Sequence, residues 1–195
     1  MSGIIQATNL QVDNIKHSGG TSAITIDSSG KVNTAQSGYE EKTAAQLNSG
    51  SGVVSNGIST LARRITLVTH ELVTSHAQNV RWRVGNGGSV LSTSIYEYIS
   101  WYSEHNGNHQ LTDNKGGTTQ MGFDAWASTA NSMNFHIEFL RIGNHWNVTG
   151  HNFNSTNNYI IGLSGRIHNV GNIDTLTLFP AANTFTSGDA AVYWE

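Results

Sequence analysis

Aromatic side chains beside turns are the residues of this chain best suited to contact a ligand. Trp101 and Tyr102 come directly before Ser-Glu-His-Asn-Gly, Trp126 comes before Ala-Ser-Thr, and His145 and Trp146 are adjacent at a third such position. A ring next to a loop can offer its flat face to a sugar, although most aromatic residues are buried, because burial contributes ~25 cal/mol per Å². These five residues are therefore the candidate ligand contacts, and the other rings are expected in the core or at subunit contacts.

The chain has nine histidines, which raises the question of a metal site. His145, Asn147 and His151 alternate along a possible strand, so their side chains would point the same way. Two imidazoles on one strand face can hold Zn²⁺ only with a further ligand from elsewhere, and the sequence indicates none. We therefore predict no bound metal and no cofactor.

Carboxylates could support glycoside hydrolysis, which in retaining enzymes needs two carboxyl groups roughly 5 Å apart. Glu138 lies in the apolar stretch at residues 135–142, where a simpler role is an ion pair with Arg141 or Arg81 at a subunit contact. The other acids are scattered one per strand or turn, at Glu97, Glu104, Asp113, Asp124, Asp174 and Asp189. No nucleophile, base and orienting group stand out, so the sequence predicts a protein that is not an enzyme.

Composition limits the class of partner. Only 12% of the 195 residues are charged and the net charge is -3, which argues against binding to nucleic acid or to an anionic membrane. No apolar run approaches ~20 residues, and the N-terminus lacks the pattern of a signal peptide. We expect a soluble protein without a leader, whose partners are neutral and polar.

Strand patterns dominate the second half of the chain. Short runs rich in β-branched and aromatic residues are separated by turn clusters such as Gly-Asn-Gly-Gly-Ser at 85–89. The predicted strands cover 60–68, 79–84, 95–102, 119–126, 133–142, 146–153, 158–167, 173–179 and 190–195. This spacing predicts an all-β fold, an antiparallel β-sandwich of the jelly-roll kind, with the strand at 173–179 covered on both faces and the last strand held in a sheet.

The first 57 residues differ from the rest. Residues 1–37 contain short apolar patches between Gly, Ser, Asn and Asp, and are predicted to form an extended anchor or a trimeric shaft. Residues 38–57 are predicted to be a linker with a short helix at 40–47, and 58–195 the sandwich domain. The patches are too small to bury themselves in a monomer. We expect them to contact copies of the chain or an anchoring partner through Ile4, Ile5, Leu10, Val12, Ile15, Ile24 and Ile26.

The segment Gly-Gly-Thr-Ser-Ala-Ile-Thr-Ile-Asp-Ser-Ser-Gly-Lys-Val at residues 19–32 resembles a motif of virion proteins of tailed bacteriophages, especially marine and cyanobacterial ones. In that family the motif lies near the N-terminus of fibres and related appendages. The resemblance covers about fifteen residues. It implies a place on the virion, with the N-terminal segment contacting other virion proteins.

A second resemblance covers about 135 residues and is more diffuse. Arg-Ile-Thr-Leu at 64–67, Trp-Arg-Val-Gly-Asn-Gly-Gly at 82–88, the Tyr96 to Trp101 strand and Phe185 to Tyr193 are similar to C-terminal domains of phage fibre and head-decoration proteins. That family commonly closes on Tyr-Gly, whereas this chain closes on Tyr-Trp-Glu.

The two resemblances together imply a homotrimeric, non-enzymatic virion fibre whose sandwich projects outward and binds host surface polysaccharide. Two alternatives stay open. The first is a capsid decoration protein that stabilises the head, and the second is a glycan-degrading tailspike enzyme, although the chain lacks the repeats of a long β-helix.

Overall fold

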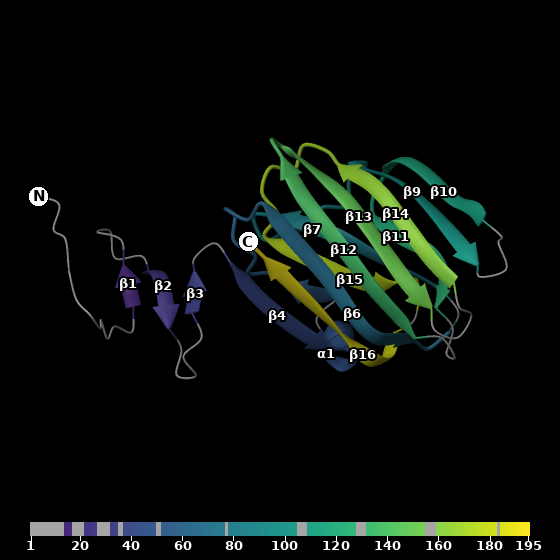
Figure 1. Ribbon diagram of the computed structural model, residues 1–195, viewed down its shortest axis with the longest axis horizontal. Coiled ribbons are helices and arrows are strands. Elements are labelled where there is room, and N and C mark those ends of the chain that lie inside the picture. The colour runs from purple at the N-terminus through teal and green to yellow at the C-terminus, as the bar shows by residue number, and fades with distance from the viewer. Residues whose placement is uncertain are drawn as a thin grey trace, which may run out of the picture.

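The computed structural model describes residues 14–16, 22–26, 32–34, 37–49, 52–76, 78–104, 109–127, 132–154, 159–182 and 184–195. Within these ranges, the side chains of 14–34 and of 78, 104, 109–114, 124–127, 154 and 159 lie outside the description. The described part is almost entirely strand (Figure 1), which confirms the all-β prediction. No helix in these ranges is long and apolar enough to cross a membrane.

Eight strands form the core of the sandwich, and they pair first with last. The early strands are β4 (Gly38–Thr43), β5 (Val53–Ser55), β6 (Arg64–Thr74) and β7 (Gln78–Asn86); the late ones are β11 (Met121–Ala127), β12 (Met133–Ile142), β15 (Thr175–Pro180) and β16 (Phe185–Trp194). β4 pairs with β16, β5 with β15, β6 with β12, and β7 with β11, all antiparallel. This long ribbon is folded over into two sheets, which is the jelly-roll arrangement predicted from the sequence.

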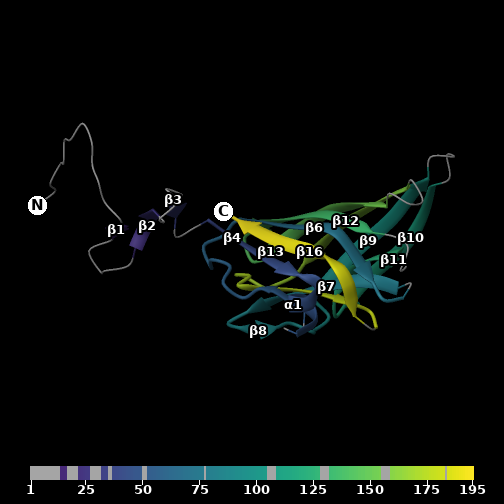
Figure 2. The ribbon, with the colours of Figure 1, turned by 90° about the horizontal axis from the view of Figure 1, so that it is seen from below.

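Four further strands widen one of the sheets. They are β9 (Tyr96–Glu104), β10 (His109–Thr118), β13 (His145–Asn154) and β14 (Tyr159–Ile167). The larger sheet has the order β10-β9-β14-β13-β12-β6-β16-β4, and the smaller one β11-β7-β15-β5, with β8 (Ser89–Val90) paired to β7. Figure 2 shows the two sheets edge-on as two layers. The larger sheet therefore presents a broad outer face.

Side chains from the inner faces of the two sheets fill the space between them. The largest fully buried ones include Trp82, Trp146 and Phe123. Phe123 of the smaller sheet stacks on Phe135 of the larger one, with ring centroids 4.9 Å apart. Burying rings of this size contributes several kcal/mol each, at ~25 cal/mol per Å². The sandwich is thus held by aromatic packing between sheets.

The two strands nearest the C-terminus lie where the sequence predicted. β15 runs between β7 and β5, and its residues 175–178 are all buried, so it is covered on both faces. β16 lies between β6 and β4 and buries Ala190 and Val192. The chain therefore ends inside a sheet, as its aromatic, apolar ending indicated.

Residues 38–57, predicted to be a linker, contribute strand, helix and strand to the sandwich. The helix predicted at 40–47 is wrong in its first half, because β4 pairs with β16 there and α1 covers only Ala44–Ser49. A capping box sets this start: the Thr43 N–H donates to Gln46 Oε1 at 2.8 Å, and the Gln46 N–H donates to Thr43 Oγ1 at 3.4 Å. Leu47 of α1 is 1% exposed, so the helix belongs to the core.

A second correction concerns β10. The predicted strands leave residues 103–118 as a connection, whereas the backbone of His109–Thr118 pairs with β9. The pairing register shifts twice along the strand, and Gly117 has a φ of 63°. The residues that resemble a turn therefore form bulges in a continuous edge strand.

The N-terminal segment forms a small antiparallel sheet of β1 (Asn14–Lys16), β2 (Ser22–Ile26) and β3 (Val32–Thr34). Figure 1 draws this sheet apart from the sandwich. Ile15, Ile24 and Ile26 lie on β1 and β2, but their side chains are outside the described residues. The same holds for the whole of Ile4, Ile5, Leu10 and Val12, so the contacts predicted for these seven residues remain predictions.

Truncation tests the place of residues 38–57 in the fold. We expect a chain that begins at Ser37 to remain folded, since it keeps all strands of the sandwich. A chain that begins at Ile58 should not fold, because it loses Leu47 and Val54 from the core and leaves β16 without β4. Circular dichroism and thermal unfolding of the two chains check this. A cooperative transition in the shorter chain would contradict it.

Tyr96 provides a second test, by pH. Its buried hydroxyl donates to the Leu91 carbonyl at 2.9 Å and accepts from the Val84 N–H at 3.1 Å. Burial raises the pKa of Tyr96 from 10.0 to about 12, while the Val84 hydrogen bond opposes this rise. A raised pKa means that the stabilisation is complete below pH 10 and is lost as the pH rises to 12.

We therefore expect Tyr96→Phe to lower the free energy of unfolding at pH 8 by roughly 1–3 kcal/mol, because Val84 loses its acceptor. The variant should also lose less stability than the native chain between pH 10 and 12. Urea unfolding across this pH range measures both effects. Equal slopes with pH in the two proteins would show that Tyr96 does not titrate as described.

Candidate functional site

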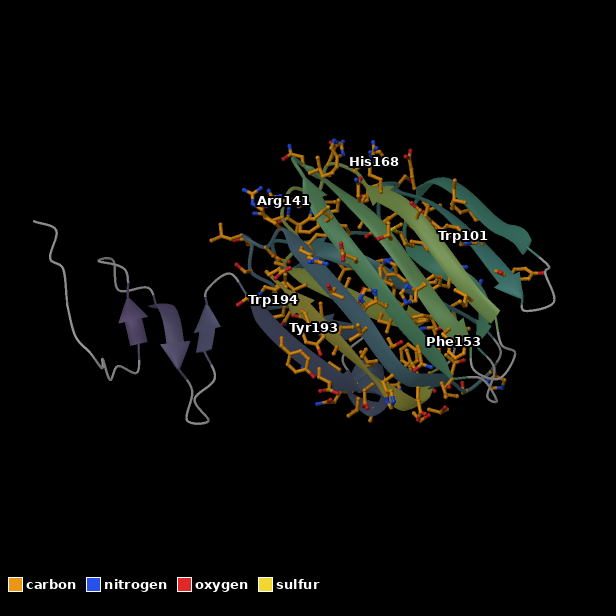
Figure 3. The ribbon with its side chains drawn as sticks, in the orientation of Figure 1. Trp101, Arg141, Phe153, His168, Tyr193 and Trp194 are labelled. Carbon is orange, nitrogen blue, oxygen red and sulfur yellow. The ribbon has the colours of Figure 1, made fainter. Side chains whose placement is uncertain are left out.

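The outer face of the larger sheet is not covered by any other element of the described chain. Figure 3 views this face with its side chains drawn, and Trp101 and Phe153 are labelled on it. Residues on β9, β12, β13 and β14 alternate between buried and exposed, as strands with one face in the core must. The exposed members on this face are Glu97, Ile99, Trp101, His136, Leu140, Ile142, Asn147, Thr149, His151, Phe153, Ile160, Ser164 and Arg166.

Trp101 lies against a glycine of the neighbouring strand. It is directly opposite Gly162 in the register of β9 and β14, and a Cβ built on Gly162 would be only 2.2 Å from Cζ2 of the indole. The missing side chain thus makes room for the ring on the sheet surface, while 42% of Trp101 stays exposed. An indole held in this way offers its outer surface to a ligand at little cost in side-chain entropy.

The same register continues the line of rings across the sheet. His151 of β13 is opposite Gly162, and His136 of β12 is opposite His151. The two imidazoles stack, with centroids 5.3 Å apart and an angle of 26° between the planes. We call Trp101, Gly162, His151 and His136 the aromatic row.

A shallow depression of about 710 Å³ lies beside the aromatic row, over β9, β14 and β13. Two cross-strand lines run through it: Glu97, Arg166 and Asn147 in one, and Ile99, Ser164 and Thr149 in the other. Lys115 of β10 also lines it. We call this the polar depression.

Most polar side chains of the depression could form hydrogen bonds with a ligand. Within the described part of the chain, the side chains of Asn147, Thr149, Ser164 and Arg166 make no hydrogen bond or ion pair. Glu97 differs, because its Oε2 lies 2.8 Å from His168 Nε2, an attractive contact when the imidazole is protonated. Hydroxyl, amide and guanidinium groups beside an exposed indole are a combination suited to binding sugars.

The structure separates the five residues predicted to contact a ligand. Trp101 is on the exposed outer face, as predicted. Trp146 is 0% exposed and donates its Nε1–H to the Gly171 carbonyl at 2.9 Å, so its prediction as a ligand contact is wrong. Tyr102 faces the other side of the sheet and packs, half-buried, against the core. The Trp126 side chain lies outside the described residues.

His145 lies at one end of the sandwich. It is half-buried, and its ring meets His168 edge-on with centroids 5.5 Å apart. Figure 3 labels His168 at this end of the sheet, away from Trp101. Among the described residues, no three His, Asp or Glu side chains come together in a way that could hold a metal ion.

Glu138 has a different partner from those predicted. Instead of Arg141 or Arg81, Arg64 of the adjacent strand β6 binds it, with 2.7 Å between Arg64 Nη2 and Glu138 Oε2. The same guanidinium lies 3.2 Å from Glu195 Oε1, and these two carboxylates raise the pKa of Arg64. The contact is within one chain, so Glu138 needs no neighbouring subunit.

Sequence reasoning missed Arg166, Thr149, Ser164 and His136 as members of a site, and it considered Asn147 only beside the histidines of a metal site. Alternation within β13 and β14 places Asn147, Thr149, Ser164 and Arg166 on one face of the sheet. The sequence gives no sign that β9 pairs with β14, because these strands are some sixty residues apart in the chain. Without this pairing, the residues of the polar depression could not be predicted to lie together.

The free energy of unfolding of variants at Trp146 and Trp101 tests whether each ring is structural or is available to a ligand. We expect Trp146→Ala to lower the free energy of unfolding by ~3–5 kcal/mol, because it leaves a cavity and an unpaired Gly171 carbonyl. Trp101→Ala should lower it by about 1 kcal/mol or less, as for other surface changes. Urea unfolding of both variants provides the numbers. Similar losses in the two would mean that Trp101 is structural.

In comparisons with known proteins, no protein-family model, curated protein or solved structure matches this chain.

Proposed function

We propose that this protein is a non-enzymatic structural protein of a phage virion, a homotrimeric appendage whose sandwich projects from the particle and binds host surface glycan. The N-terminal motif at residues 19–32 supports the location, through its resemblance to tailed-phage appendage proteins. The outer face of the larger sheet supports the binding role. Three copies on one appendage would strengthen a weak single-site affinity through avidity.

One observation carries the binding role: an exposed indole lies against Gly162 beside polar side chains that have no partner in the described part of the chain. Sugar rings present one apolar face, which an indole can stack on, and a rim of hydroxyls, which Asn, Ser and Thr can bind. Stacking supplies affinity and the hydrogen bonds supply orientation.

Capsid decoration is the second candidate, and exposed apolar side chains favour it. Phe153 and Ile160 are 45% and 53% exposed and lie opposite each other on β13 and β14. A neighbouring capsid protein could cover such a pair. Labelling of intact particles with an antibody against residues 58–195, followed by electron microscopy, separates the two. We expect label on the tail or on protruding fibres, and label spread over the head would favour decoration.

Loss of binding on changing the indole tests the proposed site. We expect Trp101→Ala to reduce binding to host surface polysaccharide by about fivefold to a hundredfold, because stacked aromatic contacts contribute about 1–3 kcal/mol. Gly162→Ala should weaken binding as well, since its Cβ displaces the indole without removing it. Isothermal calorimetry or a biosensor with immobilised polysaccharide provides the affinities.

Two matched controls complete this test. Gly57→Ala adds the same methyl group at an exposed glycine that has open space around it, and Leu61→Ala removes an exposed apolar side chain elsewhere. Both should bind like the native chain. Undiminished binding by Trp101→Ala and Gly162→Ala, with the trimer intact by light scattering, would rule out this face as the site.

A further inference from the structure

Among the charged side chains of the polar depression, Arg166 has no partner within the described part of the chain. It is exposed on β14, opposite Glu97 on one side and Asn147 on the other. Glu97 would be its natural ion-pair partner, but the Glu97 carboxylate turns to His168, 2.8 Å away. No other carboxylate of the described chain contacts Arg166. The guanidinium thus faces the depression with its five N–H donors available.

The surroundings of Arg166 favour an anion of single charge. Lys115 lines the same depression and adds a second cation. Glu97 adds one negative charge, which repels a multiply charged anion more than it repels a single carboxylate. Ser164 and Asn147 flank Arg166 with neutral donors. A planar guanidinium binds a planar carboxylate through two parallel hydrogen bonds.

The distance to Trp101 sets the size of the ligand. Gly162, against which the indole lies, and Arg166 are four residues apart on β14, which corresponds to about 13 Å along a strand. This separation exceeds a single sugar ring. A ligand that contacts both groups must therefore be an oligosaccharide, with one ring on the indole and another at the guanidinium.

We propose that the site recognises an acidic oligosaccharide, in which one sugar stacks on Trp101 and a carboxylated sugar, such as a uronic acid, binds Arg166 through its carboxylate. This inference rests on the proposed glycan-binding function and adds the chemical class of the ligand. The carboxylate oxygens accept hydrogen bonds from the guanidinium, and the ring hydroxyls bind Ser164, Thr149 and Asn147.

The test compares matched ligands. Oligogalacturonate is one probe, and the same oligosaccharide with its carboxyl groups reduced to alcohols is the neutral counterpart. We expect the native protein to bind the acidic form at least about tenfold more tightly, because a charge-assisted bidentate contact is lost in the other. Added salt should weaken binding of the acidic form and leave that of the neutral form nearly unchanged.

Variants assign this preference to Arg166. Arg166→Gln should bind both forms with equal, weak affinity, and Arg166→Lys should keep only part of the preference because the ammonium cannot form the two parallel bonds. Arg63→Gln removes the same charge from an exposed site outside the depression and should bind like the native chain. A sulfated oligosaccharide tests whether any anion suffices, and equal binding of it would overturn the assignment to carboxylates.

The outcomes distinguish this inference from the function on which it rests. Binding of both forms with equal affinity, lost in Trp101→Ala but unchanged in Arg166→Gln, would refute the acidic ligand and leave glycan binding in place. No binding of either form would refute the acidic ligand, and the proposed function would then depend on the polysaccharide test above. Binding unaffected by Trp101→Ala and Arg166→Gln alike would refute both.

Discussion

The pairing of β9 with β14 is the constraint on which the outer face depends. The two strands lie far apart in the chain and form nine consecutive residue pairs, from Tyr159 and Glu104 to Ile167 and Tyr96. A shift by one residue would turn every side chain of β9 to the opposite face. Trp101 would then point into the core, and Tyr98 and Ser100 would be exposed.

Burial on the inner face fixes this register. Tyr96, Tyr98, Leu163 and Ile167 are each at most 3% exposed, so a shifted register would expose several large apolar side chains at once. Gly162 adds a local constraint, because the Trp101 indole fits only where the opposite residue has no Cβ. The position of the proposed ligand contact thus follows from the stability of the sandwich, and the site needs no separate scaffold.

The jelly-roll core and the proposed site come from different parts of the chain. The eight core strands pair first with last, whereas Trp101, Asn147, Ser164 and Arg166 lie on strands added between them. These additions widen one sheet on one side, so the new surface can vary in sequence while the core pairs stay the same. Function carried on additions to a rigid scaffold is common among binding proteins.

Alternation and turn chemistry were sufficient to predict the fold class and many of its strands. Residues 133–142 were predicted as a strand with the bounds that the structure shows, and every second side chain from Met133 to Phe139 is apolar. Gly38–Thr43 was missed because its partner, β16, is about 150 residues away and overrides local helix propensity. β10 was missed because its bulges have turn residues.

The site could not be predicted because the sequence does not show which strands pair with each other. Both Trp101 and Trp146 lie beside turns, and nothing local says which of them faces the core. Only the pairing of strands decides that Trp146 is 0% exposed and Trp101 42% exposed. The polar residues of the depression were likewise visible as Asn, Thr, Ser and Arg, but their meeting depends on the long-range register of β9, β13 and β14.

Fluorine NMR of the protein labelled with 5-fluorotryptophan, titrated with oligosaccharides released from the surface of a proposed host, tests the central claim most directly. The chain has five tryptophans, of which Trp82 and Trp146 are fully buried and Trp101 is exposed on the outer face. Binding at this face predicts that the Trp101 resonance shifts with ligand concentration while those of Trp82 and Trp146 do not. Saturable binding that leaves the Trp101 resonance unmoved, or that shifts Trp194 alone, would contradict the account.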